Sequence, residues 1–177
     1  NIKKNTSQYE MAKNLELSFN QHINLKKYCK KKKIMYLCSA FDIPSLKFLK
    51  KINLKIFKIP SGEITNYPYL KTVGSFNKEV IMSTGMATIQ EIKEAIRVLL
   101  KTRLKKNKIT LLHCHTDYPT NYKDVNLNAM RALSKKFGVN VGLSDHTLGI
   151  EVPIAAAALG AKVIEKHFTL DRKLSGP

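Results

Sequence analysis

The sequence predicts an α/β fold with a parallel β-sheet whose faces are covered by helices. Short, almost continuously apolar runs, typical of buried parallel strands, alternate with stretches of helical length. Each apolar run is followed by a small polar residue or a histidine, one βα unit after the previous one. The residues at these strand ends are Ser39, Ser61, Ser83, His115, Ser144 and His167.

The first part of the chain is expected to contain two helices and one strand. Ser7 and Glu10 have the spacing of a capping box, which predicts the start of a short helix. A second helix is expected from about residue 24 into a lysine cluster, and the apolar residues 34–38 are expected to form the first strand.

Five more strands and their helices follow, which makes about six βα units in all. Strands are expected at residues 56–60, 80–82, 109–112, 139–146 and 161–168. Helices are expected through residues 69–73, from Thr88, over 126–137 and over 150–159. Thr88 and Glu91 form a second capping box, and Ile92, Ile96 and Leu99 lie on one side of the helix that it starts. Gly160 stands where a left-handed residue ends a helix.

The polar strand ends predict a single functional site. A (β/α)8 barrel and an open doubly wound sheet both place their sites at the carboxyl ends of parallel strands, and both architectures stay open at this point. His146 and His167 follow two neighbouring strands, so two imidazoles are expected to form half of a divalent metal site. A single histidine at a strand end is more often a hydrogen-bonded structural residue than a metal ligand.

Lys58 predicts that the ligand is an anion. It lies inside an apolar strand, three residues before Ser61, and a buried ammonium group is costly unless it reaches a negative charge. Hydroxyls, backbone amides and a lysine together suit a phosphate or a carboxylate. We therefore expect a small anionic ligand beside a divalent metal.

Composition limits the other function classes. The net charge is +18, but the lysines fall mainly at residues 26–33 and 101–108 without interleaved aromatic residues, which favours solvated helix faces and no nucleic-acid partner. No apolar run reaches the roughly 20 residues that span a bilayer, so no membrane partner is expected. Cys29, Cys38 and Cys114 lack C-x-x-C spacing, which favours a reducing, cytoplasmic location.

Several motifs together resemble one family, the sialic acid synthases, which include the bacterial N-acetylneuraminate and legionaminate synthases. The similarity covers nearly the whole chain, and the motifs occur in the family's order. They are Lys58-Ile59-Pro60-Ser61-Gly62-Glu63, Ser83-Thr84-Gly85-Met86, His113-Cys114, Tyr118-Pro119-Thr120, Gly142-Leu143-Ser144-Asp145-His146-Thr147, Glu165-Lys166-His167-Phe168-Thr169 and Ser175-Gly176-Pro177.

The resemblance implies a (β/α)8 TIM-type barrel and a carbon–carbon bond-forming transferase of carbohydrate biosynthesis. Such an enzyme condenses phosphoenolpyruvate with an N-acetylmannosamine-type sugar, giving a nine-carbon α-keto acid, sialic or legionaminic, and phosphate. Residues 1–177 would be a partial barrel domain, with the family's first two strands and its C-terminal antifreeze-like domain outside the chain. A homodimer is expected for the full-length protein, and the isolated fragment is expected to have little or no activity.

The resemblance also assigns roles to particular residues. His146 and His167 would hold the divalent metal, Mn first and Mg or Co as alternatives, and would act with Lys58 in catalysis. Tyr118 would face the sugar. The remaining substrate contacts, mainly to phosphoenolpyruvate, would come from Ser39, Lys58, Ser61, Ser83, Thr116 and Ser144.

One residue departs from the family's motifs. His115 stands where the family usually has Asn, and it would be a further metal ligand, a changed substrate contact or a structural residue.

Two alternative functions stay open beside the synthase. One is a non-catalytic, degenerate barrel with a basic binding surface, and the other is another metal-dependent barrel enzyme that uses phosphoenolpyruvate.

Overall fold

The structure is a computed structural model that describes residues 7–174, and it divides the chain into two compact units. One comprises Leu37–His167, and the other comprises the residues that flank this range on both sides. The motif Ser175-Gly176-Pro177 lies outside the described residues. None of the helices in residues 7–174 is both long and apolar enough to cross a bilayer.

The flanking unit contains two helices that begin as local sequence dictates. α1 (Gln8–Leu15) starts at the predicted capping box of Ser7 and Glu10. α2 (Phe19–Lys31) starts earlier than expected, because Ser18 and Gln21 form another capping box. The Ser18 hydroxyl accepts from the Gln21 amide, and the Gln21 side chain accepts from the Ser18 amide.

The larger unit is built on five parallel strands. They are β1 (Ile56–Ile59), β2 (Glu79–Ser83), β3 (Ile109–Cys114), β4 (Asn140–Asp145) and β5 (Ile164–Lys166), hydrogen-bonded in that order. Its helices are α3 (Ile43–Lys51), α4 (Tyr67–Ser75), α5 (Ile89–Lys101), α6 (Asn128–Phe137) and α7 (Glu151–Ala158). Short 3-10 turns cover Ser61–Glu63, Lys106–Lys108 and Tyr122–Asp124.

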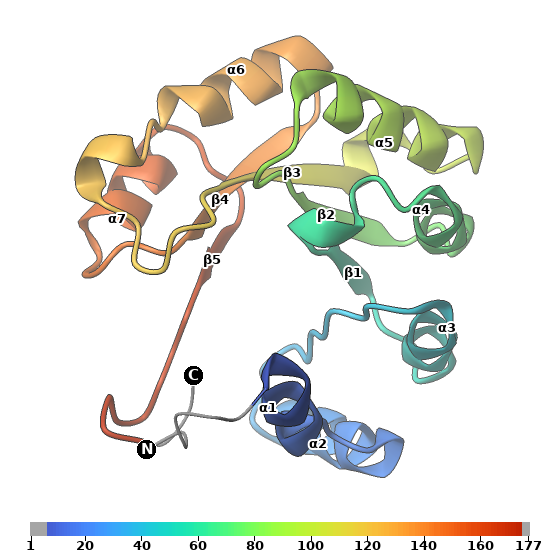
Figure 1. Ribbon diagram of the computed structural model, residues 1–177. Coiled ribbons are helices and arrows are strands. Elements are labelled where there is room, and N and C mark those ends of the chain that lie inside the picture. The colour runs from blue at the N-terminus through green and yellow to red at the C-terminus, as the bar shows by residue number, and fades with distance from the viewer. Residues whose placement is uncertain (1–6, 175–177) are drawn as a thin grey trace. The chain divides into compact units, whose positions relative to one another are not determined.

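The strand order distinguishes between the two architectures that the sequence left open. A doubly wound sheet reverses its order at a switch point, whereas these strands follow the chain order from one edge to the other. All crossovers therefore advance in one direction. Figure 1 shows the sheet curled, with α3 to α7 along its outer side, which is half of a barrel. Eight-stranded closure stays an expectation.

The predicted first strand, residues 34–38, is wrong, so the described part of the chain has five strands and not six. Ile34, Met35 and Leu37 are all exposed, so burial does not stabilise an extended conformation there. The pairing that does form is a single parallel bridge between Ser39 and Lys58.

The alternation of side chains along the strands separates the core from the site. Phe57, Val80, Met82, Ile109 and Leu111 are in register on the outer face of the sheet and are buried beneath the helices. From the helices, the predicted side chains of α5 (Ile92, Ile96 and Leu99) are buried. The inner face carries the residues of opposite parity, and the polar ones among them form the candidate site.

Candidate active site

Lys58 and Glu165 form an ion pair across the concave face of the curled sheet. Their strands, β1 and β5, are the two edges of the described sheet, which in a flat sheet would lie about 19 Å apart. Lys58 Nζ nevertheless lies 3.2 Å from Glu165 Oε2. The curl therefore brings residues from distant βα units into one site.

Glu165 also connects this ion pair to β4. The Ser144 hydroxyl donates to Glu165 Oε1 at 2.7 Å, and the two residues are direct partners in the parallel register. Ser144 and Lys58 are buried, while the Glu165 side chain keeps 40% exposure. The result is a polar network open on the side of the carboxylate.

A second group of predicted residues gathers around Gly85. The Ser61 hydroxyl accepts a hydrogen bond from the Gly85 amide at 3.0 Å. A β-carbon at Gly85 would lie 3.0 Å from Ser61 Oγ, 3.1 Å from Thr116 Cγ2 and 3.4 Å from Cys114 Sγ. Glycine at this position therefore lets the backbone amide approach the serine, and a larger residue would fill the space.

Cys114 joins the two groups, although the sequence reasoning did not select it. It is the register partner of Ser144. Burial raises the pKa of its thiol, and side-chain bonds with Ser144 and Ser61 oppose that rise. The thiol is therefore protonated at neutral pH and serves as a packing group between two hydroxyls.

Ser83 carries a buried hydroxyl that points to a ligand-binding role. Its hydroxyl is buried and has no hydrogen-bond partner among the described residues. Because a buried polar atom without a partner costs on the order of 1–3 kcal/mol, such an atom on the inner face points to a polar group that binds there. Ser83 shares the inner-face parity of Lys58.

His146 and His167 do come together, as predicted. Their ring centroids lie 5.5 Å apart, and the ring of Tyr118 packs against both, at 4.0 Å from His146 and 5.7 Å from His167. His146 Nδ1 donates to the carbonyl oxygen of His115 at 2.7 Å, which leaves Nε2 as the free ligand atom. Burial lowers the pKa of the His146 imidazole, which favours the neutral form that binds metals.

This donor set fits a divalent ion only as part of its coordination sphere. Within residues 7–174 there is no cluster of three or more His, Cys, Asp or Glu side chains that could hold a metal. Two imidazoles with one fixed tautomer suit Mn, Co or Zn, and the remaining positions would fall to water or substrate.

Of the two other histidines nearby, His113 has a structural partner, whereas the buried Nε2 of His115 has no hydrogen-bond partner among the described residues, so a contact with a ligand stays open for His115. His113 points to the outer face and its Nε2 bonds the carbonyl oxygen of Val125 at 2.8 Å. The His115 ring packs edge-on against His113, at 5.3 Å between centroids, and its backbone carbonyl holds His146. His115 thus positions a ligand through its main chain.

Ser39 and Thr116 have looser places in the site. Ser39 is half-buried and its backbone bridges to Lys58, whereas Thr116 is exposed and approaches Gly85 through its methyl group. The sequence reasoning missed Glu165, yet a signal existed. Glu165 lies two residues before His167, and residues two apart in a strand share a face.

Comparison with known proteins gives one family for the whole chain. A model described as the NeuB family matches residues 1–177. N,N'-diacetyllegionaminic acid synthase of Campylobacter jejuni is 53% identical over 171 residues, which are 97% of this chain and 51% of that protein. The enzyme of the same name from Legionella pneumophila is 45% identical over an alignment of 179 positions, which covers 100% of this chain and 50% of that protein.

The fold also has a relative among solved structures. The crystal structure of N-acetylneuraminic acid synthetase from Leptospira borgpetersenii, in complex with citrate, superimposes with a TM-score of 0.91 at 37% identity. The match covers 99% of this chain and 60% of that one. The chain spans about half the length of the curated relatives it matches.

Proposed function

The chain belongs to the NeuB family of sugar-acid synthases, and we propose that its site condenses phosphoenolpyruvate with an N-acetylmannosamine-type sugar. The products would be a nine-carbon α-keto acid and inorganic phosphate. The observation that carries the proposal is the inner face of the sheet, which carries both the buried Lys58 and the buried Ser83 hydroxyl that has no hydrogen-bond partner among the described residues.

The anion end of the substrate would be held by Lys58 and the serines. Lys58 would supply positive charge, and Ser61, Ser83 and Ser144 would donate hydrogen bonds to the phosphate and carboxylate oxygens of phosphoenolpyruvate. In the structure Lys58 is paired with Glu165, so the ammonium group is already held on the concave face of the sheet before an anion arrives. Such preorganised charge is the main means by which an enzyme stabilises a developing anion.

The sugar end would be oriented by the two histidines and Tyr118. A divalent ion, Mn first and Mg or Co as alternatives, would polarise the sugar aldehyde when held by His146 and His167. Tyr118 is 65% exposed and stacks on His146, so its free edge is available to a sugar.

The reaction balances with one water molecule. The methylene carbon of phosphoenolpyruvate bonds to the aldehyde carbon, water adds to the neighbouring carbon, and the C–O bond to phosphate breaks. Holding both substrates in line supplies much of the rate, because a bimolecular encounter becomes an intramolecular step. The homodimer expected from the resemblance stays a prediction.

The test measures phosphate release by the full-length protein. Release is expected only when phosphoenolpyruvate, N-acetylmannosamine and Mn are present together, with a nine-carbon acid detected by mass spectrometry. His167→Ala and Lys58→Met should each reduce the rate by at least about 100-fold. Lys55→Met, three residues earlier and exposed, is the matched control and should keep it.

Two outcomes would contradict the proposal. Phosphate release without the sugar would indicate a hydrolase, or another enzyme that uses phosphoenolpyruvate. Full activity of Lys58→Met would remove the anion site from the inner face.

A further inference from the structure

Three grooves on the outer surface of the larger unit are lined by basic residues. They lie between α3 and α4, between α4 and α5, and between α5 and α6, with volumes of about 670, 890 and 510 Å³. The ten cations that line them are Lys47, Lys50, Lys51, Lys71, Lys93, Arg97, Lys101, Arg103, Lys106 and Lys136. We call this set the basic track.

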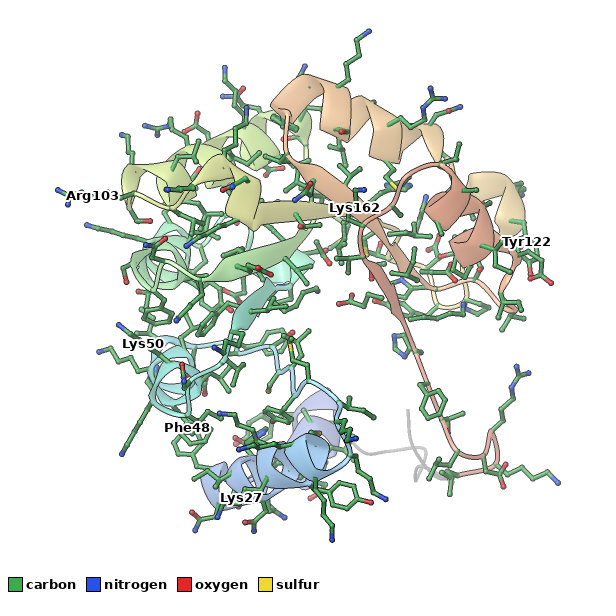
Figure 2. All side chains as sticks on the ribbon, turned by 180° about the vertical axis from the view of Figure 1, so that it is seen from behind. Lys27, Phe48, Lys50, Arg103, Tyr122 and Lys162 are labelled. Atoms are coloured by element: carbon green, nitrogen blue, oxygen red, sulfur yellow. The ribbon has the colours of Figure 1, made fainter. Side chains whose placement is uncertain are left out.

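Neighbouring grooves share basic lining residues. Lys71 and Ser75 line both the first and the second groove, and Arg97 and Lys101 line both the second and the third. Figure 2 shows Lys50 and Arg103 projecting from the outer side of the helices. The track thus crosses four neighbouring helices, a span of about 30 Å at the usual helix spacing.

The positive charge of the track is almost uncompensated. α3, α4 and α6 contain no Asp or Glu. Among the described residues the only ion pair of a track cation joins Arg97 to Glu94 on the same helix. Lys50 lies over the ring of Phe76 at 4.7 Å, which leaves its charge in place. Cations held this close repel one another, so an anion that neutralises several of them gains affinity.

The track is separate from the proposed active site. Lys58 and its partners occupy the inner face of the sheet, whereas the track lies on the helices that cover the outer face. A single small anion meets one or two cations, so ten cations in a row fit a ligand with repeated negative charges. The sequence alone favours solvated helix faces, because it does not show that these lysines share grooves.

We propose that the basic track binds single-stranded RNA. One aromatic residue lines each groove, namely Phe76, Tyr67 and Phe137 in turn. Phe137 is buried and Phe76 is half-buried against Phe57, whereas Tyr67 is 45% exposed beside Lys71, Arg97 and Lys101, so Tyr67 is the ring available for stacking on a base. Cations beside stacking rings are the usual means of binding single strands, with sites of about 4–16 nucleotides. The track also follows the convex side of the curled sheet (Figure 1), which a flexible strand can follow and a flat membrane or a stiff duplex cannot.

The test uses fluorescence anisotropy with a fluorescein-labelled oligouridine of about 16 nucleotides, which is the upper end of the usual site size for single-stranded nucleic acid. The track variant is Lys47→Glu, Lys51→Glu and Lys71→Glu together. The matched control is Lys27→Glu, Lys30→Glu and Lys31→Glu on α2, which changes the net charge equally. Figure 2 labels Lys27 on that helix. Circular dichroism verifies that both variants are folded.

The track variant should bind at least about tenfold more weakly at physiological salt, and its slope of log affinity against log salt should be shallower by about 2. The α2 control should change affinity by less than about threefold, as expected when no phosphate contact is lost. Equal losses in both variants would overturn the proposal, because they would indicate attraction by net charge alone. It would also be overturned by absent binding, or by tighter, track-dependent binding to phosphatidylserine vesicles or duplex RNA.

The track variant should still release phosphate at the wild-type rate. The RNA proposal can therefore fail while the proposed reaction stands, and the reverse also holds.

Discussion

Asp145 and Lys166 form an ion pair on the outer face of the sheet, and each lies directly before one of the two site histidines. Lys166 Nζ donates to Asp145 Oδ2 and, at 2.7 Å, to the carbonyl oxygen of Thr147. Asp145 Oδ1 accepts from the amide and the hydroxyl of Thr147 at 3.0 and 2.8 Å. The pair therefore fixes the ends of β4 and β5 from the outer face, while His146 and His167 continue the inner-face parity of the two strands.

Lys166→Met should loosen this arrangement. The Asp145 carboxylate is 2% exposed and would lose its counter-charge, whereas Lys166 keeps 27% side-chain exposure. The expected loss of folding stability is on the order of 2 kcal/mol, below the about 3–5 kcal/mol of a fully buried pair. Affinity for Mn should fall by about tenfold, as for other groups that orient metal ligands. Urea unfolding and Mn titration followed by electron paramagnetic resonance measure the two effects.

A double variant separates charge from position. Asp145→Asn with Lys166→Met leaves no buried charge, so part of the stability should return while Mn affinity stays low. Lys162→Met, on the exposed segment before β5, is the control. Unchanged Mn affinity in Lys166→Met would show that the ion pair does not position the histidines.

The sequence predicts the repeated units of this fold well, because burial and capping are local signals. The capping boxes at Ser7 and Thr88 and the apolar side of α5 appear as expected. The prediction of a strand at residues 34–38 is wrong, because an apolar run alone does not show whether its side chains will be buried against a neighbour. That information is tertiary.

The site could be predicted only in part for the same reason. Strand ends and parity select Lys58, Ser144 and the two histidines, since each follows from position along one strand. The pairing of Lys58 with Glu165 depends on how far the sheet curls, which no local pattern fixes. The expected roles of these residues in binding metal and substrate come from the family resemblance, whereas the ion pair of Glu165 with Lys58 is visible only in the structure.

Glu165→Gln should tighten the binding of phosphoenolpyruvate and slow its turnover. The amide can still accept the bond from Ser144, but it removes the negative charge 3.2 Å from Lys58 that competes with an anionic substrate. The KM for phosphoenolpyruvate should fall by up to about fivefold, since partly exposed pairs contribute at most about 1 kcal/mol. The kcat should fall because Lys58 loses its fixed orientation. Steady-state phosphate release by the full-length protein measures both, and a raised KM would contradict this role.

Gly142→Ala should destabilise the joint between β4 and the segment before β5. A β-carbon there would collide with the carbonyl oxygen of Val163 and lie 2.8 Å from Leu112 Cδ2. That carbonyl accepts the amide of Leu143 at 2.9 Å, so it cannot move freely. We expect a loss of about 1–3 kcal/mol in urea unfolding. Gly62→Ala, which meets no atom within 4 Å, should stay within about 0.5 kcal/mol. Equal losses in the two variants would refute the steric argument.

His113 should make the protein less stable in mild acid. Burial is the main cause that lowers the pKa of its imidazole below the ordinary 6.5, and the nearby His115 adds to it, against the opposing bond to Val125. Between the lowered pKa and 6.5 the unfolded chain binds more protons than the folded chain, so stability falls as the pH drops through that window.

The measurement compares the urea midpoint of the wild type with that of His113→Leu from about pH 8 to about pH 5, a range that brackets the ordinary histidine pKa. The variant should be less stable at the upper end, because the Val125 carbonyl oxygen loses its donor. Its midpoint should nevertheless fall less steeply with acid than that of the wild type. Parallel curves would mean that other groups, His146 among them, cause the acid sensitivity, and that His113 keeps an ordinary pKa in the folded protein.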